Sequence, residues 1–535
     1  MKKTLRIAIL FFTSILVSCG DDINNGGDQP TPSQQGTYVI NVFNGNKNDQ
    51  DAIVSYDKNT YTLTIDDVDY YLAGKTAVCK GININAKTYK KDVKIYSLIG
   101  YNNIYYQVEA IRDFYVNGSE ITSIDIPEGV YSIHEYCFQG CKNLRKVTLP
   151  EKMQRLGARS FEGCEQLSEI TFPKGINTVA PHVFQSCKAL TSIVLPSDVT
   201  EIGDSAFCDC KAIESIKIEG RINKLGISCF DRCESLKDIE LPNSLESMGD
   251  NTFRFCKSLE SMKIPNGIKV LPNNTFEECE ALTSVSLPAT IEVIGSESFK
   301  SCKSLTSIEL PSNVKSIKPY AFNKCERLTS INLPSALKCL SKSSFAECSM
   351  LPSITLPEAL DTIGNDCFRA CISLKGISIP KNIHKLEANT FAGCYSLEKM
   401  IVPEGIDSIG SGCFALCIRL KEIELPSTLK FVGSSAFDVL SSIKKFVCKA
   451  TEVPESSMEL GPVTDDGNQQ FYTVFGLAER QDMKLVFTED TKTHFEDATL
   501  YVPAESIDLY KSHLIWNIWS RPDDNGNEVG IQAIQ

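Results

Sequence analysis

Cysteine is the residue type in this chain that could do the most chemistry, since 22 of the 535 residues are cysteines. Four pairs of them have the spacing i, i+4, and two such pairs together could hold a zinc ion. These pairs are Cys137/Cys141, Cys229/Cys233, Cys367/Cys371 and Cys413/Cys417. Thiols could instead form disulfides, or fill a core as small polarizable groups. The outcome depends on where the chain places them.

Carboxylates and histidines are the next candidates for chemistry. Glu240 and Glu309 fall in segments with strand-like alternation, where a pair of acids could hydrolyse a glycosidic bond. Acidic residues are scattered in this way along the whole chain, however, as on an ordinary solvated surface. The five histidines occupy unlike positions, and the sequence contains no H-E-x-x-H, no G-x-S-x-G and no glycine-rich phosphate loop. We therefore expect no catalytic residue, no metal and no cofactor, and predict that the chain is not an enzyme.

Length and charge restrict the classes of protein further. A chain of 535 residues is too long for one compact core of ordinary size, so we expect several domains or an extended repeat array. The hydrophobic fraction of 42% is that of a folded chain. The net charge of −13 argues against a nucleic-acid partner, because a protein that binds the phosphate backbone needs a basic face.

A repeat of 23 residues dominates the sequence and accounts for most of the cysteines. Phenylalanine recurs with this period at Phe138, Phe161, Phe184, Phe207, Phe230, Phe253, Phe276, Phe299, Phe322, Phe345, Phe368, Phe391, Phe414 and Phe437. A cysteine stands three residues after thirteen of them, at Cys141, Cys164, Cys187, Cys210, Cys233, Cys256, Cys279, Cys302, Cys325, Cys348, Cys371, Cys394 and Cys417. The residue before each phenylalanine is Ser, Ala, Thr, Val or Cys, so this position selects small size rather than a metal ligand.

One unit of the repeat shows how it could fold. Ile308 and Leu310 alternate with polar residues as in a half-buried strand, and Pro311 ends that strand because proline cannot donate to a ladder. The spacing of Phe322 and Cys325 fits a short helical, 3₁₀ or turn segment. Between these two segments, one position is glycine in eight of the fourteen copies, which predicts a turn with positive φ.

A single unit of this kind cannot bury its apolar side chains, so neighbouring units must stack in register. Stacking predicts one long parallel β-sheet, with the bulkier segments on the opposite side, and therefore a curved solenoid. Cysteines of adjacent units would come within disulfide range, but their side chains would run parallel and the column has an odd number of members. We predict that most of these thiols are free and buried.

The repeat pattern L-x-x-I-x-L-P-x-x-V-x-x-I-x-x-x-x-F-x-x-C-x-x-L resembles the BspA-like leucine-rich repeat of surface proteins in anaerobic bacteria. The resemblance covers residues 121–448 with about fourteen repeats of 23 residues. It implies a right-handed, curved leucine-rich-repeat solenoid with a parallel β-sheet. Several members of this family are described as adhesins for host matrix proteins or for other bacteria, so the resemblance implies a binding function.

The N-terminus has the features of an exported lipoprotein. Positive residues precede a short apolar segment at residues 7–17, which is typical of a signal peptide and too short for a membrane span. This segment ends in Leu-Val-Ser-Cys, which resembles the bacterial lipobox and implies removal of residues 1–18 and lipidation of Cys19. The acidic residues that follow resemble the surface-export signal of Bacteroidetes-type lipoproteins, and residues 19–36 would form a flexible tether. We expect a surface-exposed outer-membrane lipoprotein; an ordinary secretory signal with an incidental cysteine is the alternative.

The segments that flank the repeat lack its period. Residues 37–120 alternate like strands and predict a small β-rich N-terminal cap, whereas residues 449–535 predict an α+β C-terminal cap and tail. Aromatic residues are frequent in both, and they could seal the ends of the core or form binding surfaces. The candidates are Tyr70, Tyr71, Tyr105, Tyr106, Trp516 and Trp519.

The outward strand positions form the natural binding face of such a solenoid. Of thirty such positions, thirteen are Ser or Thr, seven are acidic, five are Lys and none is aromatic, so the face could contact a partner weakly or simply be solvated. Glu240, Glu309 and Glu424 are the candidate binding residues on it. We predict a monomeric, surface-anchored adhesion protein that binds host matrix, host cell-surface or microbial surface proteins. The alternatives are a carbohydrate-binding accessory of a glycan-uptake system, with a surface glycan as ligand, and a passive structural protein.

Overall fold

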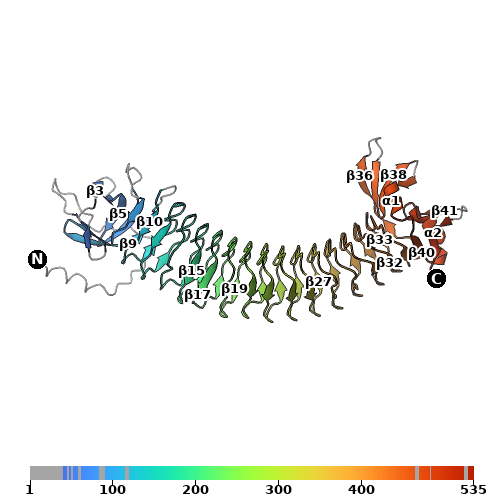
Figure 1. Ribbon diagram of the computed structural model, residues 1–535, viewed down its shortest axis with the longest axis horizontal. Coiled ribbons are helices and arrows are strands. Elements are labelled where there is room, and N and C mark those ends of the chain that lie inside the picture. Colours follow the sequence, from blue (N-terminus) through green and yellow to red (C-terminus); the bar gives the residue numbers. More distant parts are fainter. Residues whose placement is uncertain are drawn as a thin grey trace.

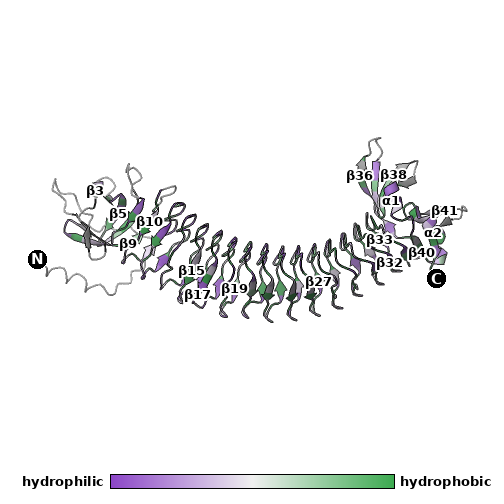
Figure 2. Cartoon of the chain, viewed as in Figure 1, coloured by the Kyte–Doolittle hydropathy of each residue, from purple (hydrophilic) through white to green (hydrophobic). Residues whose placement is uncertain are grey.

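The computed structural model describes residues 40–534 except for gaps at 45–46, 50–51, 53, 58–61, 83–90, 115–119, 464–468, 482–483 and 523–527. Within this part of the chain, the repeat forms a solenoid that bends into an arc, with a β-rich segment at one end and a mixed segment at the other (Figure 1). Hydrophobic and hydrophilic residues are interleaved along the whole arc (Figure 2). The predicted curved solenoid of stacked parallel strands is confirmed. The predicted signal peptide, Cys19 and the tether lie outside the described residues.

The N-terminal segment is a sheet that continues into the solenoid. Its strands are β1 (Ile40–Asn44), β2 (Lys47–Asp49), β3 (Val54–Asp57), β4 (Thr62–Ile65), β5 (Val68–Ala73), β6 (Thr76–Ile82), β7 (Asp92–Lys94), β8 (Leu98–Tyr101) and β9 (Ile104–Ile111). The sheet has the order β2-β1-β8-β9-β6-β5-β4-β3, in which β6 and β9 pair in parallel and the other neighbours are antiparallel. Strand β9 pairs in parallel with β11, and β7 with β10, which belong to the first solenoid turn.

Each solenoid turn contributes up to two short strands, which stack into two parallel rows. The first strand row contains β10 (Ser123–Asp125), β12 (Lys146–Thr148), β15 (Ser192–Leu195), β17 (Ser215–Ile218), β20 (Ser261–Lys263), β22 (Ser284–Ser286), β24 (Ser307–Glu309), β26 (Ser330–Asn332), β30 (Lys399–Ile401), β32 (Glu422–Leu425) and β34 (Lys445–Cys448). The second strand row contains β11 (Ser132–Ile133), β13 (Arg155–Leu156), β14 (Thr178–Val179), β16 (Glu201–Ile202), β18 (Lys224–Leu225), β19 (Ser247–Met248), β21 (Val270–Leu271), β23 (Val293–Ile294), β25 (Ser316–Ile317), β27 (Cys339–Leu340), β28 (Thr362–Ile363), β29 (Lys385–Leu386), β31 (Ser408–Ile409), β33 (Phe431–Val432) and β35 (Glu455–Ser456).

The second strand row corrects the expectation of a single sheet. It forms where the Val-x-x-Ile part of each unit turns an apolar residue inward, so that Ile294 of β23 pairs with Ile317 of β25, for example. The strands of each row belong to several short sheets. The first strand row is interrupted between β26 and β30, a stretch in which the structure describes every residue.

The segment around each repeat phenylalanine is a run of turns, since residues 120–457 contain no helix. Residues two before and two after the phenylalanine have positive φ in turn after turn, as Tyr320 (59°) and Lys324 (59°) do on either side of Phe322. This alternation prevents a helix and aims backbone N–H groups along the solenoid axis. The N–H of Phe276 thus donates to the carbonyl of Ser298 in the next unit at 2.8 Å. These bonds form a third ladder from turn to turn.

The recurrent glycine has a different role from the one predicted. It does not have positive φ; instead, a Cβ atom at this position would lie 2.3–2.7 Å from a backbone atom of the preceding turn. Glycine is required because two backbones approach closely, not because of its conformational freedom. Six copies carry a side chain here, so the close approach belongs to these eight turns only. The residues are Gly157, Gly203, Gly226, Gly249, Gly295, Gly364, Gly410 and Gly433.

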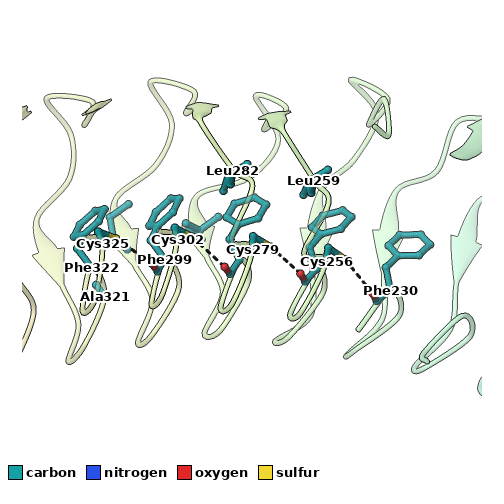
Figure 3. Packing of buried hydrophobic residues seen from close by; sticks show 14 of the residues in the cluster. Phe230, Cys256, Leu259, Cys279, Leu282, Phe299, Cys302, Ala321, Phe322 and Cys325 are labelled. Carbon is teal, nitrogen blue, oxygen red and sulfur yellow. Dashed lines mark hydrogen bonds between the residues drawn. The ribbon is translucent and has the colours of Figure 1, made fainter. Parts of the chain in front are cut away.

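The core consists of columns that run along the solenoid (Figure 3). Rings of consecutive repeat phenylalanines stack with centroids 5.1–5.9 Å apart, as Phe299 and Phe322 do at 5.1 Å. Beside them, the twelve column cysteines from Cys164 to Cys417 each donate the thiol to the carbonyl of the preceding unit's phenylalanine, for example Cys302 Sγ to Phe276 O at 3.2 Å. All column phenylalanines and cysteines have fully buried side chains. The cysteine column therefore joins neighbouring turns through hydrogen bonds as well as through packing.

The C-terminal segment closes the open end of these columns. Its elements are β36 (Glu459–Val463), β37 (Gln469–Thr473), β38 (Gly476–Gln481), β39 (Lys484–Phe487), α1 (Glu489–Thr493), β40 (Thr499–Val502), η1 (Ala504–Ser506), α2 (Ile507–Ser512), η2 (Trp516–Trp519), β41 (Arg521–Pro522), β42 (Glu528–Val529) and β43 (Ile531–Ala533). Strands β40 and β43 extend the first strand row beyond β34. Phe475 stacks on Phe437 at 6.0 Å and so ends the phenylalanine column.

Candidate functional site

The outward positions of the first strand row form a polar surface, which we call the strand face. It is built from two residues per turn, as Ser307 and Glu309 are in β24, and both point away from the buried Ile308 between them. Seven turns expose a serine at the first of these positions. They are Ser192, Ser215, Ser261, Ser284, Ser307, Ser330 and Ser353.

The three candidate glutamates of the strand face do not form a cluster. Glu240, Glu309 and Glu424 occupy the same position of the repeat, but three and five turns separate them. At about 4.8 Å per parallel strand, they are more than about 14 Å apart. Glu240 and Glu309 are exposed, whereas Glu424 is half-buried and pairs with Lys449. A glycosidase needs its two carboxyl groups within about 5–9.5 Å, so these residues do not have that geometry.

Four of the six candidate aromatic residues lie in the core of the two end segments. Tyr70, Trp516 and Trp519 have fully buried side chains and Tyr106 is 3% exposed. Trp516 and Trp519 pack around Phe475 with centroids 5.1 and 5.7 Å away. A side chain in this position cannot touch a partner, so these four residues seal the ends of the solenoid.

The other two aromatic candidates lie at the surface of the N-terminal segment. Tyr105 is 54% exposed and follows the turn between β8 and β9. Tyr71 is half-buried on β5, and the ammonium group of Lys80 lies 5.0 Å from its ring centroid. The two tyrosines therefore remain candidates for contact with a partner.

The cysteines are arranged for packing rather than for reactivity. Burial raises the pKa of Cys417 to about 12, with a smaller opposing effect from its hydrogen bond to the backbone. Partly exposed Cys208 also has its pKa raised to about 11, by burial first and by Asp231 second. All 21 cysteines in the described part of the chain have free thiols there. No group of three or more His, Cys, Asp or Glu side chains among the described residues could hold a metal ion.

Two shallow hollows mark places where a strand row is interrupted. One, of about 530 Å³, lies between the turns of Ile354 and Ile377, and Gly376 at its edge leaves space where other turns have a side chain. The other, of about 580 Å³, lies between Met248 and Val270. In the described part of the chain, no helix is long and apolar enough to cross a bilayer.

The repeat pattern did not identify a further surface feature, which is the position four residues after each repeat phenylalanine. Four residues after each repeat phenylalanine, the first nine copies have Lys or Glu, at Lys142, Glu165, Lys188, Lys211, Glu234, Lys257, Glu280, Lys303 and Glu326. Three of the five later copies have Ile372, Tyr395 and Ile418 at this position, and all three side chains are exposed; the other two have Ser349 and Ser441. A comparison of this one repeat position between the copies would have revealed the change, because the residue types at that position differ.

The comparisons with known proteins agree with this architecture. Residues 109–237, 223–352 and 339–457 match the model of the BspA type leucine rich repeat region. No curated protein sequence matches the chain. Among solved structures, a leucine-rich repeat protein from Bacteroides ovatus is 26% identical, with 68% of this chain and 95% of that chain covered and a TM-score of 0.55.

Two further solved structures match with lower scores. A leucine rich cell surface protein from Faecalibacterium prausnitzii is 21% identical, with 73% of this chain and 93% of that chain covered and a TM-score of 0.33. A leucine-rich repeat protein from Eubacterium ventriosum is 18% identical, with 71% and 95% covered and a TM-score of 0.40. Since the family model matches well over half of its length, this chain belongs to the BspA type leucine-rich repeat family.

Proposed function

We propose that this protein is a surface-anchored adhesion protein, which presents its solenoid to proteins on a host matrix, a host cell or another microbe. Leucine-rich repeat proteins generally bind other proteins, and this chain belongs to such a family. The observation that carries the proposal is the strand face, where exposed side chains stand in fixed register on a scaffold whose core columns are fully buried. A rigid, extended surface of this kind loses little conformational entropy when it binds.

The lipid anchor on Cys19 is part of the proposal. The lipobox-like Leu-Val-Ser-Cys and the apolar segment before it support the anchor. Cells that express the chain and are fed an alkyne fatty acid should label the wild-type protein but not Cys19→Ala. Protease treatment of intact cells should degrade the wild-type protein if it faces outward. Equal labelling of both forms would contradict lipidation at Cys19.

The glycan-uptake alternative has lost its main support. It relied on aromatic residues as stacking platforms, but Tyr70, Tyr106, Trp516 and Trp519 lie in the core. A glycan site would therefore have to use Tyr71 or Tyr105.

Purified residues 20–535 should be screened by biolayer interferometry against matrix proteins, bacterial cell-surface proteins and surface glycans. We expect saturable binding to at least one protein. Binding to glycans alone would support the uptake accessory instead. If no protein or glycan binds, a passive structural protein becomes the better explanation.

A further inference from the structure

The position four residues after each repeat phenylalanine forms one edge of the solenoid, and its chemistry changes along the arc. In the first nine copies it carries Lys or Glu, and neighbouring turns form ion pairs with N–O distances of 2.9–3.7 Å. Lys303 with Glu280 and Lys211 with Glu234 are examples. Exposed pairs of this kind contribute only about 0–1 kcal/mol each, so the main effect of the row is to keep the edge hydrated.

This charged row gives way to apolar residues near the C-terminal end. Ile372, Tyr395 and Ile418 follow in three consecutive turns and are 39%, 42% and 36% exposed. We call these three residues the apolar stripe. Scattered exposed apolar residues are ordinary, but a contiguous set in repeat register is not explained by solvation.

Cationic side chains border the apolar stripe. Lys375, Arg419 and Lys421 are exposed on the same turns, and Glu398 lies among them. Lys421 pairs with Glu398 at 3.3 Å, whereas Lys375 and Arg419 have no ion pair within the described part of the chain. This local excess of positive charge contrasts with a net charge of −13 for the whole chain. Exposed tyrosine and arginine side chains beside aliphatic ones are typical of the residues that contribute most of the binding energy in a protein interface.

We propose that the apolar stripe and its cationic border form a docking site for a partner protein whose contact segment carries apolar side chains flanked by carboxylates. This inference deepens the proposed function and rests on it, since it names a binding surface in addition to the strand face and the chemistry that this surface selects. The apolar row supplies desolvation energy, and Lys375 and Arg419 select acidic partners and speed association.

Two other occupants fit less well. In an antiparallel face-to-face dimer centred on Tyr395, Lys375 of one copy would meet Lys421 of the other, and the two Glu398 side chains would also meet. Like charges would then oppose one another at these three positions. An anionic membrane surface would attract the border but repel a chain with a net charge of −13.

The decisive variant continues the charged row through the stripe, as I372K/Y395E/I418K. The same position of the repeat accepts Lys or Glu in nine other copies, so this variant should fold, with an unchanged far-UV circular dichroism spectrum and melting temperature. The matched control is Ile401→Lys, which also adds a charge in place of an exposed isoleucine, but on the strand face. The probe is a phage-displayed library of random linear peptides, selected on wild-type residues 20–535.

We expect the selected peptides to combine apolar with acidic residues. They should bind wild-type and Ile401→Lys protein equally and the triple variant at least about tenfold more weakly. The proposal is overturned if no peptide is enriched, if the enriched peptides are basic, or if they bind the triple variant as well as the wild type.

Three further measurements distinguish this proposal from self-association, from membrane binding and from a protein partner that binds elsewhere. A wild-type dimer that the triple variant converts to a monomer in sedimentation would assign the stripe to self-association. Binding to phosphatidylglycerol vesicles that the variant abolishes would assign it to a membrane. A protein partner from the screen that binds the triple variant with full affinity would leave the proposed function intact and overturn the stripe as its site.

Discussion

At the residue scale, the cysteine column illustrates how a reactive side chain can serve packing. The thiol is small enough to lie beside the stacked phenylalanine rings, and it donates to a carbonyl that also accepts a backbone N–H, as Phe276 O does from Cys279 N at 3.1 Å. Burial raises the pKa of the column thiols from Cys164 to Cys417, as for Cys302, so that they remain protonated and unreactive at neutral pH.

This arrangement predicts how the thiols respond to alkylation. In native protein at neutral pH, a mass-tagged maleimide should react slowly and first with Cys208 and Cys339, which are the partly exposed cysteines of the described chain. In denaturant without reductant, nearly all thiols should be labelled, because the column contains free thiols. Mass spectrometry counts the tags. A denatured protein with few tags would show that the column is oxidised.

The thiol hydrogen bond can be tested at Cys302 in the middle of the array. Cys302→Ala removes both the sulfur volume and the donor, and should lower the free energy of unfolding by about 1–2 kcal/mol. Cys302→Ser keeps a donor within reach of the Phe276 carbonyl, so it should cost no more than the alanine variant. If the site were purely apolar, serine would be the worse of the two because of its buried hydroxyl. Urea denaturation followed by fluorescence and circular dichroism ranks the variants.

At the element scale, the turns between the second strand row and the phenylalanine segment depend on close backbone contact. Gly249 would place a Cβ 2.5 Å from the backbone nitrogen of Ile227, whereas a Cβ at Gly376 would meet nothing within 4 Å. Gly249→Ala should therefore destabilise the protein by about 2 kcal/mol or more, since the backbone of two turns must separate. Gly376→Ala is the matched control and should be neutral or stabilise by up to about 1 kcal/mol. Equal melting temperatures for the two variants would refute the steric role.

The C-terminal segment offers a second matched pair in its two tryptophans. Trp516 donates its indole N–H to Ser456 Oγ at 3.1 Å, whereas the buried indole N–H of Trp519 finds no acceptor among the described residues. Replacement by phenylalanine removes similar volume in both cases. Trp516→Phe should therefore lower the free energy of unfolding by about 1 kcal/mol more than Trp519→Phe, because only Trp516→Phe breaks a hydrogen bond, the one to Ser456 Oγ. Thermal unfolding compares them, and the reverse order would contradict this assignment.

The sequence predicted those elements that repeated residues specify. The sequence predicts the repeat period, the first strand row and the phenylalanine and cysteine columns, because the same residue type recurs at these positions in each copy. The left-handed positions could not be predicted, since residues as different as Tyr320, Lys324 and Val439 occupy them. For Trp516 and Trp519 the sequence allows either burial or a binding surface, because closure of the last turn depends on contacts with Phe475 that no local pattern encodes. The pattern shared by all copies could not predict the apolar stripe, because the stripe consists of three copies that differ from the others at one position of the repeat.

At the scale of the whole molecule, the solenoid is a one-dimensional structure in which each turn contacts mainly its neighbours. Its three ladders and its core columns all repeat every 23 residues, so the register between turns holds the molecule together. An interior turn should therefore be removable as a unit, provided that the flanking turns meet in register. The same deletion should fail when it is shorter than a full repeat.

Deletion of residues 284–306 removes one repeat and joins Thr283 to Ser307, which restores every column. The product should fold with the parent circular dichroism spectrum and be shorter by about one turn, given the 5.5 Å between the rings of Phe276 and Phe299. Deletion of residues 284–294 alone would set strand positions against turn positions and leave phenylalanine and cysteine without partners, so it should unfold the array or expose it to protease. Small-angle X-ray scattering and limited proteolysis distinguish these results. If both deletions behave alike, local sequence rather than register between turns determines the fold.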